Sequence, residues 1–102
     1  MNYQTIKRLQ KENGFAYMQN LINSGAVWSM EGSMGREAMY LLESGACMLP
    51  KTVYRDYYGN RIPSRDELKA GTKGTYQNSV RYYSDLDYSI EVYDLTNDTE
   101  IL

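Results

Sequence analysis

The spacing of apolar residues predicts helices in the first half of the chain. A short helix follows Thr5, with Ile6 and Leu9 on one face, and the pair Asn13-Gly14 ends it. A second helix has apolar side chains at positions 15, 18, 21 and 22, and Gly25 stands where a C-terminal cap is expected.

A third helix repeats the pattern of the second. Ser33 is its predicted N-cap, apolar side chains recur at positions 34, 38, 41 and 42, and Gly45 ends it. Residues 21–26 (LINSGA) and 41–46 (LLESGA) match closely, 20 positions apart. One match of this length does not indicate a solenoid, so we interpret it as two helices ended by the same glycine device.

The later pattern predicts a small antiparallel sheet formed by residues 26–30, 46–57 and 86–94. A turn at 58–60 would lead the chain back into a short return strand at 61–62. Because the helices come mostly from the N-terminal half and the strands from elsewhere, we expect an α+β fold.

Two further helices are expected after the return strand. Ser64 and Glu67 form a capping-box pattern for a short helix over 65–70. Residues 76–84 read as helix with Tyr76, Val80 and Tyr83 on one face. The 102 residues suffice for one domain, and we expect the end of the chain, from about residue 95, to fray.

Composition argues against several chemistries. The chain has no histidine, which removes the commonest general base at neutral pH and the Ser-His and Cys-His nucleophile pairs. Its lone cysteine, Cys47, cannot form an internal disulfide, and with carboxylates alone it is a poor zinc site. We therefore expect a non-enzymatic protein with no cofactor and no metal.

The chain contains neither an apolar run long enough to span a membrane nor a secretory signal. Together with the single cysteine, this predicts a cytoplasmic protein. Charge is unevenly distributed: residues 51–81 carry a net +4, whereas residues 82–102 carry −6. The middle of the chain suits an anionic partner, and the acidic tail argues against tight DNA binding.

Tyrosine and arginine gather in the same middle segment. The candidate binding residues there are Tyr54, Arg55, Tyr57, Tyr58, Arg61 and Arg65. Tyrosine and arginine together suit a protein interface, and they equally suit a nucleotide base with its phosphate. The alternative is a core in which tyrosine replaces phenylalanine, since the chain has only one Phe.

Two glycine-bearing segments add basic residues. In residues 31–36, glycines flank a helix start and Arg36 lies in its first turn, which is a possible anion site. Residues 71–75 carry Lys73 between glycines and threonines, a composition that can contact phosphate. An ordinary capped helix and an ordinary surface turn are the alternatives.

Three segments, at residues 28–38 (WSMEGSMGREA), 55–65 (RDYYGNRIPSR) and 71–75 (GTKGT), resemble a group of small accessory proteins of tailed bacteriophages. The likeness covers roughly residues 20–80. It implies a phage or prophage origin and action inside a bacterial cell, and it carries over no functional residue.

These observations favour a phage-type accessory protein that binds and inhibits a host protein, for example one of a defence system. A second hypothesis is a small-ligand protein for a nucleotide or another phosphate compound. One or two tyrosines would then converge with five basic residues: Arg36, Arg55, Arg61, Arg65 and Lys73. A third is a structural protein that self-assembles into a homo-oligomer.

Overall fold

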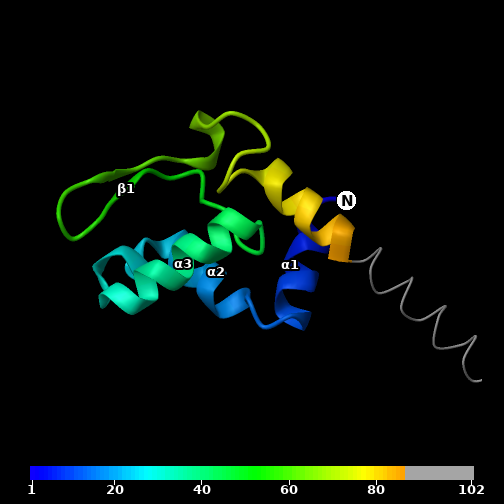
Figure 1. Ribbon diagram of the computed structural model, residues 1–102, viewed down its shortest axis with the longest axis horizontal. Coiled ribbons are helices and arrows are strands. Elements are labelled where there is room, and N and C mark those ends of the chain that lie inside the picture. Colours follow the sequence, from blue (N-terminus) through cyan, green and yellow to red (C-terminus); the bar gives the residue numbers. More distant parts are fainter. Residues whose placement is uncertain (87–102) are drawn as a thin grey trace, which may run out of the picture.

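The computed structural model describes residues 1–86, which adopt an α+β fold (Figure 1). The helices are α1 (Tyr3–Glu12), α2 (Ala16–Ser24) and α3 (Gly32–Ser44), and residues 76–86 are helical as well. Two 3-10 turns, η1 (Ala26–Ser29) and η2 (Arg65–Glu67), and an antiparallel hairpin of β1 (Tyr54–Arg55) and β2 (Arg61–Ile62) complete the fold. The α+β prediction is confirmed. Of the strand expected at 86–94, residue 86 is helical and the rest lies outside the described residues.

The two matching segments end their helices in the same way. In both, the serine hydroxyl donates to the leucine carbonyl three residues earlier and accepts the alanine amide two residues later, over 3.1–3.2 Å. Gly25 and Gly45 follow with φ of +78° and +99°, a backbone conformation that favours glycine. The repeat is therefore a repeated helix cap, as the sequence indicated.

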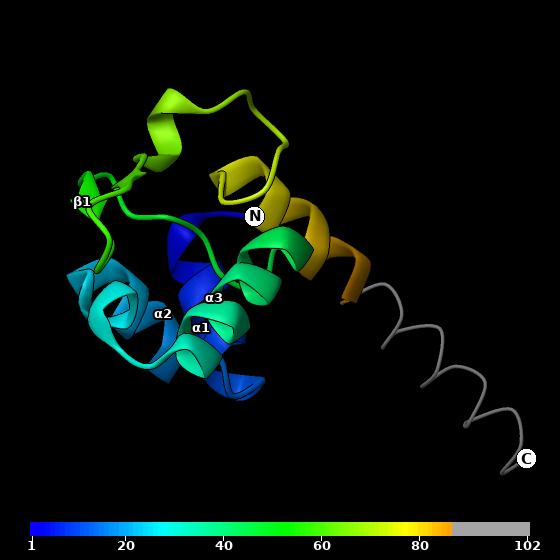
Figure 2. The same ribbon diagram turned by 60° about the vertical axis from the view of Figure 1, so that its left-hand side comes forward.

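Two clusters of buried side chains form the core. The larger one is built by α2, η1, α3 and the segment after it, and includes Ile22, Val27 and Leu42. The smaller one joins α1 to the helix at 76–86 through Ile6, Leu9, Met48 and Tyr83, and Figure 2 shows these two helices near each other. Phe15 and Tyr82 pack against both clusters and meet edge to face at 6.5 Å, so the two clusters form one continuous core.

Residues 46–50 are buried, but they do not form the strand that we expected. Side chains satisfy part of their backbone, and the amides of Cys47 and Leu49 donate to the Leu41 and Gly74 carbonyls. Gln19 accepts the Met48 amide at 2.9 Å and donates to the Met48 carbonyl at 2.8 Å. Gln10 and the Tyr83 hydroxyl both donate to the Ala46 carbonyl, at 3.1 and 2.6 Å. Amides and a hydroxyl thus take the place of a β-ladder.

The strand predicted at 26–30 is also wrong, because residues 26–29 form η1. The left-handed Gly25 turns the chain sharply, and the Trp28 amide then donates to the Gly25 carbonyl three residues back. The expected turn at 58–60 and return strand at 61–62 are confirmed. Tyr54 pairs with Ile62 across the hairpin, although β1 spans only two residues of the predicted 46–57.

Two predicted helix caps differ in the structure. α3 begins at Gly32 with Glu31 as its N-cap, and the Ser33 hydroxyl donates to the Glu31 carboxylate at 2.7 Å. The Ser64–Glu67 capping box is incomplete, because the Ser64 side chain makes no cap hydrogen bond, and the Glu67 carboxylate pairs with Arg61. The helix predicted over 65–70 is accordingly a single 3-10 turn, whereas the helix predicted over 76–84 is present.

Candidate functional site

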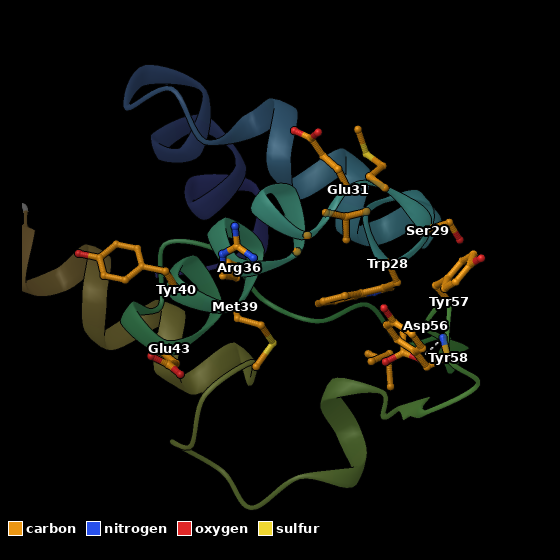
Figure 3. Close-up of a pocket in the computed structure, with 15 residues that line it drawn as sticks. Trp28, Ser29, Glu31, Arg36, Met39, Tyr40, Glu43, Asp56, Tyr57 and Tyr58 are labelled. Atoms are coloured by element: carbon orange, nitrogen blue, oxygen red, sulfur yellow. Dashed lines mark hydrogen bonds between the residues drawn. The ribbon is translucent and has the colours of Figure 1, made fainter.

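A groove of about 840 Å³ lies between α3 and the hairpin (Figure 3). Its α3 wall contains Gly32, Gly35, Arg36, Met39, Tyr40 and Glu43. Its hairpin wall contains Asp56, Tyr57, Tyr58 and Ile62. The segment from Val27 to Glu31 joins the walls, and in Figure 3 the Trp28 ring lies between Met39 on one side and Asp56 on the other.

The hairpin is held in place by contacts with α2 and η1. The Tyr54 hydroxyl donates to the Asn23 carbonyl at 2.9 Å, and its ring packs against Gly25, where any Cβ would lie 2.4 Å from a ring carbon. The Tyr57 amide donates to the Trp28 carbonyl at 3.1 Å. The hairpin wall of the groove is therefore fixed to the larger core cluster.

Asp56 shapes the tip of the hairpin. Its carboxylate accepts the backbone amides of Tyr58 and Asn60 at 2.9 and 2.8 Å, and also the Asn60 side chain. Desolvation raises the pKa of Asp56, but the hydrogen bonds from Asn60 and Tyr58 outweigh it and hold the pKa below its ordinary value. The carboxylate stays charged, and the turn presents Tyr57 and Tyr58 side by side.

Exposed apolar side chains concentrate in this groove. Eight large hydrophobic residues of the described chain are exposed, and five of them line the groove: Met30, Met39, Tyr40, Tyr57 and Tyr58. Tyr58 is 85% exposed and Tyr57 78%, and their rings meet edge to face at 5.3 Å. Nothing in residues 1–86 covers these side chains, so the groove is a candidate binding surface.

Charge in the groove is mainly negative. Glu31, Glu43 and Asp56 line it, and Arg36 is the only basic residue that does so. The Arg36 guanidinium lies over Gly32, where an added Cβ would be 3.1 Å from Nη1. The groove therefore offers little attraction for a phosphate and more for a basic or neutral group.

The structure separates the residues that the sequence singled out. Arg36, Tyr57 and Tyr58 share the groove, whereas Tyr54 is half-buried and anchors the hairpin. Arg55 donates to the Gly59 carbonyl at 2.9 Å within the hairpin.

The remaining three basic candidates do not line the groove, although Lys73 lines a smaller apolar pocket that adjoins it. Arg61 forms a bidentate pair with Glu67 at 2.7 Å, and its hydrogen bond lowers the pKa of Glu67. Arg65 donates to the Leu49 carbonyl and lies over the Tyr3 ring. Lys73 is 4.0 Å from Glu43. Arg36, Arg61 and Lys73 line no common cavity in the described part of the chain.

Sequence reasoning missed Trp28, Met30, Met39 and Tyr40. A signal for two of them was present, because Met39 and Tyr40 are apolar residues that fall outside the buried stripe of α3. Large apolar residues on the solvent side of an amphipathic helix indicate a binding face.

A smaller, almost wholly apolar pocket of about 280 Å³ adjoins the groove. Trp28, Met39 and Ile62 line both cavities, and Leu42, Leu49 and Leu68 are among the residues that complete the pocket. Trp28 is 8% exposed, and its indole N–H has no hydrogen-bond partner among the described residues. An unpaired buried donor is uncommon in folded proteins.

Two further observations concern the thiol and the metal ligands of the described residues. Burial, and then the charge of Glu37, raise the pKa of the Cys47 thiol to about 12, so it is not a thiolate at neutral pH. Residues 1–86 contain no group of three or more candidate metal ligands. None of their helices has the length and apolarity needed to cross a bilayer.

The chain matches no protein-family model, no curated protein and no solved structure. The candidate site therefore rests on its own geometry.

Proposed function

We propose that this protein is a non-enzymatic binding protein that captures a segment of a partner protein in the groove between α3 and the hairpin. The gathering of five exposed apolar side chains in one groove carries the proposal. Tyrosine, methionine and arginine are enriched at protein interfaces, and this lining contains all three. A buried thiol with a raised pKa and the absence of histidine support a role without chemistry.

The charges of the groove narrow the choice of partner. Three carboxylates beside one arginine favour a segment with a large apolar residue next to a lysine or arginine. The same charges give less support to a nucleotide or phosphate ligand. In line with the phage resemblance, we propose that the partner is a protein of a bacterial host and that binding inhibits it.

The test is selection of short segments from a random peptide library displayed against the immobilised protein. Selected peptides should combine a large apolar residue with a basic residue. The double variant Tyr57→Ala/Tyr58→Ala should lose them, because it removes two exposed rings of the groove. Tyr17→Ala is the matched control, since Tyr17 is 69% exposed and does not line the groove.

Charge reversal tests the second part of the proposal. Glu43→Lys should weaken binding of the basic peptides about tenfold, whereas Glu37→Lys on the same helix, outside the groove, should leave it within about threefold. Peptides with no shared pattern, or thermal stabilisation by a nucleotide in place of peptide binding, would overturn the proposal.

A further inference from the structure

The charges of the groove follow a regular order along α3. Arg36 and Glu43 both line the groove and lie seven residues apart, so they stand two turns apart on one face of the helix (Figure 3). Met39 lies between them and lines the groove as well. This wall therefore presents a cation, an apolar side chain and an anion in that order.

Two of the three carboxylates that line the groove are held by hydrogen bonds. Asp56 accepts three of them within the tip of the hairpin, and Glu31 accepts one from a serine hydroxyl at 2.7 Å. Glu43 lies 4.0 Å from Lys73, and both side chains are 58% exposed, so this ion pair is loose. Glu43 is therefore the carboxylate best placed to bind a cation of the partner.

The helix dipole of α3 has the matching direction. Glu43 lies in the last turn of the helix, and the Arg36 guanidinium folds back over Gly32, the first residue of the helix. A helix favours anions near its N-terminus and cations near its C-terminus. The Arg36 end of the groove therefore suits an acidic group of the partner, and the Glu43 end suits a basic group.

The length of this wall sets the spacing of the partner's charges. The rise along α3 to Glu43 is about 10 Å from Arg36 and about 16 Å from Gly32, over which the guanidinium lies. In an extended segment, side chains on one side lie about 7, 13 or 20 Å apart, at two, four or six positions. Only the separation of four positions falls within the range on α3. The five residues that this separation spans are too few for a stable helix in water, which favours the extended form.

We infer that the groove binds an extended partner segment in which an acidic and a basic residue stand four positions apart, with a large apolar residue midway. The acidic residue pairs with Arg36, the basic residue pairs with Glu43, and the apolar residue contacts Met39. The charges fit in either chain direction, so the acidic residue comes first or last. This inference rests on the proposed function, because it names the segment that the groove selects.

The test counts charged pairs among eight-residue peptides selected from a fully random displayed library. With the wild type, acidic–basic pairs four positions apart should be enriched about threefold or more over pairs at three or five positions, the gain that one exposed ion pair gives. A large apolar residue should stand midway between the charges in most of these peptides.

Charge reversal on α3 should change the selected pattern in a defined way. Arg36→Glu should select two basic residues four positions apart, and Glu43→Lys should select two acidic residues at the same spacing. Both side chains are exposed, so both variants should fold, which thermal unfolding checks. Lys51→Glu is the control, because Lys51 is exposed and lines neither cavity, and it should keep the wild-type pattern.

The outcomes separate this inference from the proposed function. Selected peptides that combine an apolar and a basic residue but lack the acidic one would overturn the inference alone. So would another spacing, such as the seven positions of a helical segment, or a pattern that stays the same in both charge-reversal variants. If no peptide is selected at all, the proposed function fails and the inference fails with it.

Discussion

Gly25 ends α2 with a φ of +78° and lies against the Tyr54 ring. Gly59, at the tip of the hairpin, has a similar φ of +84° but nothing within 4 Å of an added Cβ. A side chain at Gly59 would therefore strain only the backbone. A side chain at Gly25 would strain the backbone and also collide with the Tyr54 ring.

We expect Gly59→Ala to destabilise the protein by about 1–2 kcal/mol through backbone strain alone. Gly25→Ala should cost at least about 1 kcal/mol more, because its methyl group displaces the Tyr54 ring. Urea unfolding of both variants measures the difference. Equal losses would show that Tyr54 moves aside without cost.

The buried thiol of Cys47 makes the free energy of unfolding depend on pH. Its pKa is raised from 9.0 to about 12, so the folded state holds the thiol proton more tightly than the unfolded chain does. This contribution to stability is fully present below pH 9 and is lost as the pH rises towards 12. Cys47→Ala should therefore lose less free energy of unfolding than the wild type between pH 8 and pH 10.5. If the free energy of unfolding fell equally with pH in the wild type and in Cys47→Ala, this expectation would be wrong.

At the scale of elements, the segment 46–50 explains why the sheet was predicted too large. Its run of apolar residues has the composition of a buried strand, and periodicity alone cannot say what pairs with its backbone. The answer lies in Gln10 and Gln19, polar residues on the buried faces of α1 and α2. Local patterns reveal helices and caps, whereas these pairings join residues 29 and 36 positions apart.

We expect Gln19→Met to destabilise the protein by about 2–4 kcal/mol, because the buried amide and carbonyl of Met48 would both lose their partner. Gln77→Met is the control. Gln77 is exposed, and its substitution should change the free energy of unfolding by no more than about 0.5 kcal/mol. Chemical denaturation measures both, and a small loss in Gln19→Met would show that water reaches residue 48.

The hairpin shows the same limit at the functional site. Its turn and return strand were predictable from the local residues 58–62. The sequence alone could not tell the roles of the arginines apart, because each role depends on residues elsewhere in the chain. Arg61 pairs with Glu67, and Arg65 contacts Leu49 and Tyr3. Only tertiary contacts show that Arg36 lines the groove whereas Arg61 and Arg65 are bound by other residues.

At the scale of the whole molecule, the two core clusters are joined through Phe15 and Tyr82. We therefore expect one cooperative unfolding transition. Trp28 fluorescence reports the larger cluster, and far-UV circular dichroism reports all the helices. The two signals should share a midpoint in the wild type, whereas Phe15→Ala should lower that midpoint. A fluorescence transition at lower denaturant in the wild type would mean that the clusters unfold separately.

The two glycine caps have a consequence for the order in which the chain folds during its synthesis. Gly25 leaves room for Tyr54, and Gly45 leaves room for the Asn78 carbonyl, which would lie 2.6 Å from an added Cβ. Gly25 and Gly45 leave the ribosome before Tyr54 and Asn78, the residues that later occupy these two spaces. Helices α1 to α3 can form as they emerge, but Ile6 and Leu9 gain their partner Tyr83 only after the helix at 76–86 has been synthesised. The nascent chain therefore exposes its first helix until the last described helix arrives to cover it.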